Sequence, residues 1–180
     1  MSLNRTVALV GMMGAGKTSV GKRVAARLGV PFKDADQEIE AAAGLTVAEI
    51  FEKHGEPEFR SGERRVIARL LSEPPLVLAT GGGAYMDPAT RAAMKQTAFT
   101  IWLKAPVELL LARTAKRQTR PLLNNSDPRG TLERLLEQRA PVYAEADYVV
   151  DCVDGPKDVA VEQVLTMLKS RGLAMEEATP

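Results

Sequence analysis

The chain has 180 residues, a formal net charge of +1 and a hydrophobic content of 45%, which suits one globular domain with a sizeable core. The near-neutral charge excludes a global electrostatic attraction to nucleic acid or a membrane surface, so any anion must be bound locally. The single cysteine, Cys152, excludes a disulfide framework within the chain and is expected in the core. No run approaches about 18 consecutive apolar residues and no charged-then-apolar leader is present, so we expect a cytoplasmic protein.

Near the start of the chain, residues 11–18 read Gly-Met-Met-Gly-Ala-Gly-Lys-Thr, which fits G-x-x-x-x-G-K-[ST] in full. An apolar run, expected to be a strand over residues 6–10, precedes it, and a helical pattern over residues 19–28 follows. In this context the small residues let successive backbone N–H groups wrap a phosphate chain at the positive end of the helix. Lys17 is then expected to reach the β- and γ-phosphates, and the Thr18 hydroxyl to bind Mg²⁺. The alternative is a glycine-rich turn followed by Lys-Thr by chance.

Further along, short apolar runs alternate with helical patterns. Strands are expected at residues 32–34, 76–79, 97–103 and 148–150. Helices are expected at residues 37–43, 58–71, 106–114, 130–144 and 157–170, with further starts at the capping box Thr46-Val47-Ala48-Glu49 and at Asp87-Pro88. This alternation implies an α/β fold with a parallel sheet covered on both faces. Ligands of such sheets bind beyond the carboxyl ends of the strands, where the segments after each strand should converge.

Two carboxylates, Asp34 and Asp36, follow the second expected strand. Alternation in an extended segment places such residues on the same face, where two acids repel unless a cation or a donor lies between them. Mg²⁺ can satisfy one carboxylate, and a substrate hydroxyl or an arginine the other. The alternative is that Asp36 caps the helix expected at residues 37–43.

The third expected strand ends in Thr80 and three glycines, Gly81, Gly82 and Gly83. Three glycines in a row indicate a backbone that approaches something closely or takes positive φ, with N–H groups available for a hydroxyl or an anion. The alternative is a plain flexible turn. Many phosphate-loop enzymes place a metal-binding Asp at the end of this strand, and its absence here makes Asp34 the expected metal carboxylate.

Arginines, which suit bidentate recognition of carboxylates and phosphates, gather at three places. They are Arg60, then Arg113, Arg117 and Arg120, and finally Arg139. The alternative for any one of them is a solvated helix face. The polar and basic stretch 116–128 fits a lid that closes over phosphates and brings charge to the transferring group. His54 is expected on the surface and Trp102 in the sheet, without a chemical role.

Six segments together resemble the shikimate kinase family. They are GMMGAGKTSVGK (11–22), DADQEIE (34–40), IFEKHGEPEFRSGE (50–63), ATGGGA (79–84), RPLL (120–123) and QRAPVY (138–143). The resemblance runs from about residue 3 to about residue 169. The phosphate loop alone is shared with hundreds of families, whereas this ordered combination is far more restrictive.

The resemblance implies a reaction and a set of site residues. The reaction is transfer of a phosphoryl group from ATP, with Mg²⁺, to the 3-hydroxyl of shikimate. The phosphates would bind Gly14, Ala15, Gly16, Lys17, Thr18 and Ser19; Thr18 and Asp34 would hold the metal; Arg113 would lie against adenine; and Arg120 would bridge the phosphates and the transferring group. The acceptor would bind Asp36, which accepts the 3-hydroxyl proton, the carboxylate clamp Arg60 and Arg139, and the backbone donors Gly81, Gly82 and Gly83; Glu63 would orient Arg60.

The same resemblance implies a nucleoside-monophosphate-kinase-like fold, a P-loop kinase whose five parallel strands lie in the order 2-3-1-4-5. Residues 1–180 would form one domain, with a substrate-binding region at about 35–63 and a lid at about 115–127. We expect a monomer that binds a small molecule and neither nucleic acid nor a membrane. One departure is that Asp154-Gly155-Pro156, with Lys157 next, stands where the family often has a basic residue near the adenine.

Two other functions stay open from the residues. One is a gluconate kinase, which also phosphorylates a hydroxylated acid. The other is a GTPase-like nucleotide switch, which requires an N-K-x-D sequence; residues 124–127 read Asn-Asn-Ser-Asp and lack the lysine.

Overall fold

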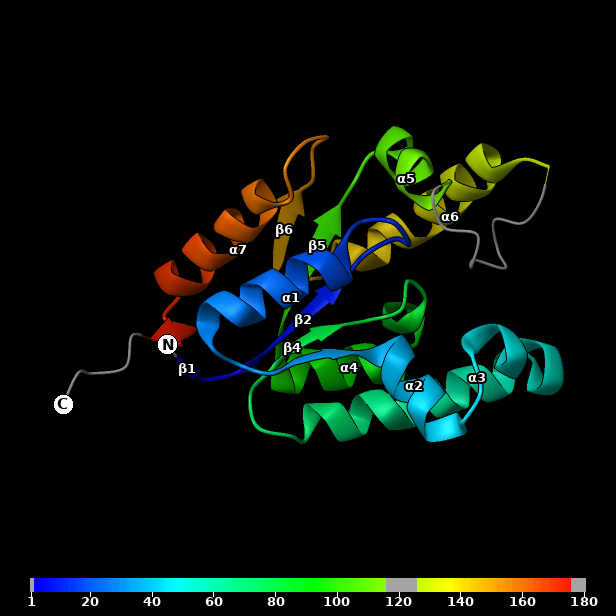
Figure 1. The fold of residues 1–180 in the computed structure, drawn as a ribbon, viewed down its shortest axis with the longest axis horizontal. Coiled ribbons are helices and arrows are strands. Elements are labelled where there is room, and N and C mark those ends of the chain that lie inside the picture. The colour runs from blue at the N-terminus through cyan, green and yellow to red at the C-terminus, as the bar shows by residue number, and fades with distance from the viewer. Residues whose placement is uncertain (1, 116–125, 176–180) are drawn as a thin grey trace.

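A computed structural model describes residues 2–115 and 126–175, and its centre is a five-stranded parallel sheet (Figure 1). The strands are β2 (Thr6–Val10), β3 (Phe32–Asp34), β4 (Val77–Ala79), β5 (Ala98–Lys104) and β6 (Tyr148–Asp151). Their order in the sheet is β3-β4-β2-β5-β6. Counted as the five expected strands, this is the predicted order 2-3-1-4-5, so the predicted P-loop kinase fold is confirmed.

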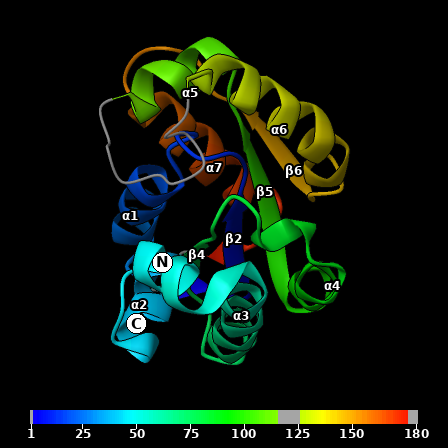
Figure 2. The same ribbon diagram turned by 90° about the vertical axis from the view of Figure 1, so that its right-hand side faces the viewer.

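Helices cover both faces of the sheet (Figures 1 and 2). On one face, α1 (Lys17–Leu28) packs against β4 and β3, and α7 (Asp158–Ser170) packs beside it against β6. On the other face, α4 (Pro88–Thr97) packs against β5, with α3 (Val47–Leu71) alongside. The remaining helices, which flank the carboxyl ends of the strands, are α2 (Ala35–Ala43), the 3₁₀ helix η1 (Ala84–Met86), α5 (Val107–Thr114) and α6 (Pro128–Tyr143).

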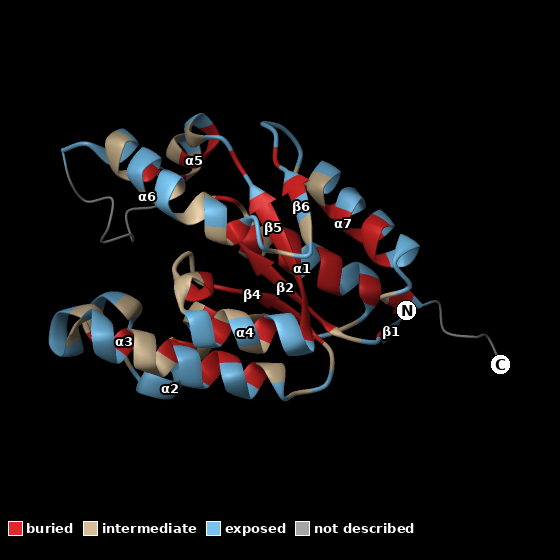
Figure 3. Cartoon of the chain, turned by 180° about the vertical axis from the view of Figure 1, so that it is seen from behind, coloured by how far each residue is buried: buried red, intermediate tan, exposed pale blue. Residues whose placement is uncertain are grey.

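The central strands are buried throughout because both of their faces are covered. All five residues of β2 are buried, as are all three of β4, and Figure 3 shows this as an unbroken buried layer. Such continuous apolar runs are typical of parallel strands between two helical layers. Trp102 packs in the sheet, Cys152 is buried and His54 is exposed, all as expected. The layer fixes where the loops after β2, β3 and β4 emerge.

The structure corrects the interpretation of the two aspartates. The helix expected from residue 37 begins at Ala35, and Asp34 is its N-cap: the Asp34 carboxylate accepts a hydrogen bond of 3.1 Å from the Asp36 backbone N–H. The proposed cap at Asp36 is therefore wrong, and so is the argument from alternation in an extended strand. A short strand that runs directly into a helix leaves no extended residue at 36.

The two helices expected before and after residue 55 are joined end to end in α3. The predicted capping box is present, with Thr46 and Glu49 bonding each other's backbone N–H groups. The two segments are separated by Gly55, whose φ of 79° and ψ of 171° are not helical. The predicted N-cap Asp87 accepts from the Thr90 N–H at 2.9 Å and starts α4.

A second, two-stranded sheet was not predicted. β1 (Ser2–Leu3) pairs antiparallel with β7 (Ala174–Met175). Two-residue strands are too short to show any periodicity in the sequence. Within residues 2–115 and 126–175, none of the helices has the length and apolar character needed to cross a membrane.

Candidate active site

The loops that follow β2, β3 and β4 surround a cavity of about 420 Å³ at the carboxyl ends of these strands. Its lining includes the phosphate loop, both aspartates, the start of the glycine segment and residues of α5 and the loop before α7. The polar and glycine members are Gly14, Gly16, Lys17, Thr18, Ser19, Asp34, Asp36, Thr80, Gly81, Gly82, Arg113, Asp154, Gly155 and Lys157. The predicted convergence of the strand ends is thus present in the structure.

The phosphate loop has the backbone geometry that the glycine spacing predicts. Gly14 and Gly16 have φ of 82° and 100°, which side-chained residues rarely adopt. Lys17 is buried, and its Nζ donates to Gly11 O at 2.7 Å and to Met12 O at 2.9 Å. The ammonium is therefore held inside the curve of the loop, at the positive end of α1.

Thr18 and Asp34 bring two oxygen groups together at the entrance of α1. The Thr18 hydroxyl donates to Asp34 Oδ2 at 2.7 Å. Mg²⁺ takes one or two protein oxygens and completes its shell with water and substrate phosphates. A hydroxyl and a carboxylate within hydrogen-bond distance, beside the loop that binds phosphate, fit this ion. No cluster of three or more His, Cys, Asp or Glu side chains suited to a metal occurs in the described residues.

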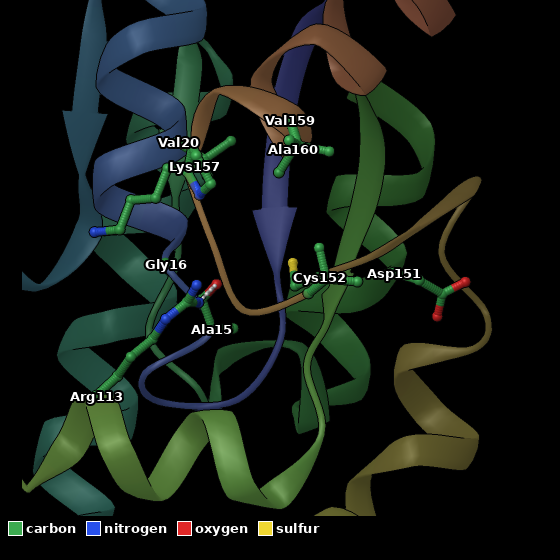
Figure 4. A pocket seen from close by; sticks show the side chains of 11 residues that line it. Ala15, Gly16, Val20, Arg113, Asp151, Cys152, Lys157, Val159 and Ala160 are labelled. Atoms are coloured by element: carbon green, nitrogen blue, oxygen red, sulfur yellow. Dashed lines mark hydrogen bonds between the residues drawn. The ribbon is translucent and has the colours of Figure 1, made fainter.

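Arg113, from the last turn of α5, reaches the outside of the phosphate loop. Its Nη1 donates to Ala15 O at 3.1 Å and is 3.4 Å from Gly14 O. On this side lies a small pocket whose lining includes Ala15, Arg113 and Cys152 (Figure 4). Pro156 also lines it. Cys152 is buried and packs in the core, and burial raises the pKa of its thiol.

The glycine segment after β4 is packed on both sides by charged side chains. A Cβ atom at Gly81 would lie 3.0 Å from Asp36 Oδ1 and 3.0 Å from Glu63 Oε2, and one at Gly83 would lie 2.5 Å from Arg60 Nη2. None of the three glycines has a positive φ. Of the two reasons that the sequence offered for this segment, close approach is therefore the correct one.

Gly82 connects this segment to the phosphate loop. A Cβ atom there would lie 3.3 Å from Arg139 Nη1 and 3.4 Å from the backbone nitrogen of Met13. The Nη1 group of Arg139 is buried and has no hydrogen-bond partner among the described residues. A buried guanidinium nitrogen in this state needs an acceptor, and a bound anion would supply one.

Arg60 and Glu63 form an ion pair at the base of the segment. Arg60 Nη1 donates to Glu63 Oε1 at 2.7 Å, whereas Glu63 Oε2 is buried without a partner among the described residues. Burial raises the pKa of the Glu63 carboxyl above its usual range, and the nearby Asp36 carboxylate acts in the same direction, against the opposing charge of Arg60. The pair holds the Arg60 guanidinium beside Gly83, as expected for an orienting carboxylate.

Comparison with known proteins identifies the family. The sequence profile described as shikimate kinase matches residues 13–169. The chain belongs to the shikimate kinase family. It is 52% identical over 176 residues to the shikimate kinase of Bradyrhizobium diazoefficiens, covering 98% of this chain and 85% of that protein. The structure of a shikimate kinase from Acinetobacter baumannii in complex with shikimate superimposes with a TM-score of 0.91 at 42% identity, covering 94% of this chain and 95% of the other.

Membership of the shikimate kinase family makes the chain an ATP-dependent kinase. The solved structure that would support the gluconate kinase alternative is less similar to this chain. A gluconokinase from Sinorhizobium meliloti has a TM-score of 0.66 at 20% identity and covers 96% of this chain and 95% of its own. At this identity the similarity shows a shared fold only.

Two contacts of this shikimate kinase family member were not found from the sequence. Tyr143, within the QRAPVY segment, is fully buried and donates its hydroxyl to Gly82 O, which fixes the middle of the glycine segment. Burial raises the pKa of Tyr143 to about 12, against the charges of Arg139 and Arg60, so the phenol stays a donor at neutral pH. The second is Lys157, whose Nζ donates to Ser19 Oγ at 2.9 Å. The predicted lid residues Arg117 and Arg120 lie outside the described residues.

Proposed function

We propose that this chain transfers the γ-phosphoryl group of ATP to the 3-hydroxyl of shikimate. The observation that carries the proposal is the position of Gly82, between the phosphate loop at Met13 and the guanidinium of Arg139. It supports a site for a carboxylate next to a site for phosphates. A small hydroxylated acid held there presents a hydroxyl to the end of the phosphate chain, as in-line transfer requires.

On the nucleotide side, the backbone donors are Gly14, Ala15, Gly16, Lys17, Thr18 and Ser19. Lys17 balances the negative charge that develops on the transferring group, because its ammonium lies inside the loop. Arg113 binds against the adenine from the small pocket that it lines with Pro156. We assign to Arg120 a contact with the phosphates from a lid at about residues 115–127.

Thr18 and Asp34 are the residues that would hold Mg²⁺ on this side, since their oxygens lie 2.7 Å apart. When bound, the ion neutralises charge on the β- and γ-phosphates. Asp34 serves in place of the metal-binding Asp that is absent after β4.

On the acceptor side, Arg60 and Arg139 clamp the carboxylate of shikimate, and Gly81, Gly82 and Gly83 offer backbone donors to its ring. Glu63 positions Arg60 through their 2.7 Å ion pair. Asp36 accepts the proton of the 3-hydroxyl. At the same time the oxygen of that hydroxyl bonds to the γ-phosphorus, and the bond between the γ-phosphorus and the leaving oxygen of ADP breaks. Asp36 suits this role because it lines the phosphate cavity and lies against Gly81.

We further propose that residues 1–180 act as a single kinase domain, a monomer in the cytoplasm, with residues 35–63 as the substrate-binding region. The proposed substrate is a small molecule, and the proposal includes neither a nucleic acid nor a membrane as a partner. The support is the compact set of elements, from α2, α3 and α6, around one glycine segment.

The test is release of ADP with ATP, Mg²⁺ and shikimate, compared with gluconate and a panel of other hydroxy acids. We expect turnover with shikimate and a rate with gluconate close to that without an acceptor. The variant Asp36→Asn should bind both substrates and lose most of its turnover, with Glu133→Gln, an exposed carboxylate of α6, as a control that retains it. Equal turnover of gluconate and shikimate would contradict the proposal.

A further inference from the structure

The loop between β6 and α7 brings a lysine to the nucleotide side of the cavity. Gly155 has a φ of 137°, a conformation that favours glycine, and the chain then passes through Pro156 to Lys157 at the start of α7. Lys157 lines both the 420 Å³ cavity and the small pocket beside Arg113. In Figure 4 its side chain extends from this loop across α1.

The ammonium of Lys157 is bonded to the phosphate-binding segment itself. Its Nζ donates to Ser19 Oγ at 2.9 Å, and Ser19 also lines the cavity. A hydroxyl oxygen that accepts from an ammonium has its own hydrogen directed elsewhere, and the charge makes that O–H a stronger donor. Ammonium and hydroxyl together thus form a cationic donor group at the first turn of α1, where an anion is already favoured.

The position of this pair along the site specifies which part of a nucleotide it faces. Lys17 and Thr18 lie at the part of the loop that receives the β- and γ-phosphates. Ala15, Arg113 and Pro156 line the pocket on the opposite side. Because Lys157 lines both spaces, it stands between the outer phosphates and the nucleoside, which is the place of the α-phosphate.

A structural role is the competing explanation, since α7 and α1 are also joined by ion pairs. Arg23 lies 3.5 Å from Asp158 and Arg27 lies 2.9 Å from Glu162, all four side chains being largely exposed. These pairs lie farther along the helices, outside the linings of both the cavity and the small pocket, whereas the contact of Lys157 with Ser19 lies at the cavity wall. The two exposed pairs already join the two helices without Lys157, although each contributes little to stability.

We propose that Lys157, together with Ser19, binds the α-phosphate of the nucleotide. This proposal rests on the proposed function, because it assumes that the cavity takes ATP.

The experiment is calorimetric titration of ADP, AMP and adenosine into the wild-type chain and the variants Lys157→Met and Lys157→Arg. Lys169→Met, an exposed lysine in the last turn of α7, is the matched control. We expect Lys157→Met to weaken ADP and AMP about tenfold, as for loss of one charge-assisted hydrogen bond, and to leave adenosine unchanged. Lys157→Arg should restore most of the loss.

An unchanged affinity of Lys157→Met for ADP would overturn the proposal, and so would equal losses for AMP and adenosine, which a purely structural role predicts. If Lys157→Met does not fold, Ser19→Ala replaces it and should show the same selective loss for AMP over adenosine. Shikimate-dependent ADP release by the wild type is measured separately. Its failure would refute the acceptor assignment while the nucleotide titrations still report on Lys157.

Discussion

The nucleotide side and the acceptor side of the cavity are built in different ways. The side proposed for the nucleotide is one continuous segment, residues 11–19, which holds one buried lysine against its own backbone. The acceptor side is assembled from α2, α3 and α6, whose charged side chains meet around three glycines. A continuous loop is set by local geometry, whereas the acceptor side depends on long-range packing. Changes on the two sides should therefore have separable effects.

The two sides also differ in how their charged groups are paired within the chain. Lys17 is satisfied by two carbonyl oxygens of its own loop. On the acceptor side, Arg139 Nη1 and Glu63 Oε2 are buried and have no hydrogen-bond partner among the described residues. Buried groups without a partner destabilise the folded chain. A ligand that accepts a hydrogen bond from Arg139 removes this cost and therefore binds more tightly. We therefore expect this side of the cavity to favour an acid.

The largest effect is expected at Lys17. The variant Lys17→Met keeps the length of the side chain but removes the charge at the transferring group, so kcat should fall by about 10²–10³, as for other preorganised charge-stabilising groups. Steady-state ADP release measures this loss. Lys22→Met, an exposed residue on the same helix, should keep near-native turnover; a near-native kcat for Lys17→Met would contradict the role of Lys17.

The next largest effect is expected at Arg139, on the acceptor side. Arg139→Ala should weaken shikimate binding about tenfold to a hundredfold, since each charge-assisted hydrogen bond contributes roughly 1.5–3 kcal/mol, and should leave ATP binding nearly unchanged. Arg134→Ala, an exposed position one turn earlier on α6, is the control for both ligands. Calorimetry with each ligand measures the losses, and unchanged shikimate affinity in Arg139→Ala would refute the clamp.

Arg60→Ala should add a loss of stability that Arg139→Ala does not show. It leaves the Glu63 carboxylate buried without its partner, which we expect to cost on the order of 2–3 kcal/mol, less than for a fully buried pair because Arg60 is partly exposed. Denaturant unfolding measures the difference. The double variant Arg60→Ala/Glu63→Gln should recover part of the stability while shikimate binding stays weak.

A smaller effect tests the close approach at the glycine segment. Gly83→Ala would place a Cβ atom 2.5 Å from Arg60 Nη2, so the flexible end of Arg60 must move. Because Gly83 has a φ of −94°, the backbone itself accepts alanine. We expect KM for shikimate to rise several-fold, with ADP affinity unchanged, whereas Gly62→Ala, where nothing lies within 4 Å, should leave both constants as they are. An unaltered KM in Gly83→Ala would show that Arg60 is not held at this position.

The smallest effect concerns pH. Because burial raises the pKa of Glu63, the native chain retains a proton there at pH values at which the unfolded chain has lost it. Stability from this group is fully present below the ordinary Glu pKa of about 4.3 and is lost as the pH rises through the raised value. Glu63→Gln should therefore flatten the decline in the free energy of unfolding above that pH, measured by urea unfolding across a pH series. An identical slope in both proteins would contradict a raised pKa.

The comparison of the two sides also explains what could be predicted from the sequence. The phosphate loop is predictable because a strand, a glycine pattern and a helix follow one another without interruption. Asp34 was correctly expected beside Thr18, yet the helix boundary at Ala35 was missed because the cap is a side-chain contact with the Asp36 N–H and not a periodic signal. The order of the strands was obtained through the family resemblance.

Contacts between distant segments stayed hidden. Tyr143 and Gly82 are separated by 61 positions, and Lys157 and Ser19 by 138. Neither spacing has a local pattern, and both depend on how α6 and α7 pack on the sheet. Arg60 and Arg139 stood out in the sequence as arginines, but the roles proposed for them, and for Glu63, came from the family resemblance. The three glycines could be recognised in the sequence. The positions of the arginines were needed to decide whether close approach or positive φ requires them.

The pairing of Ser2 with Met175 brings the ends of the described chain side by side. The two ends of the described chain therefore lie close together, and the position of the chain break matters little to the central sheet. A short Gly-Ser bridge between the two ends, with new termini opened in the exposed turn after α3, should yield a circular permutant that keeps every strand neighbour. The residues of the candidate active site would then keep their positions in a chain with new termini.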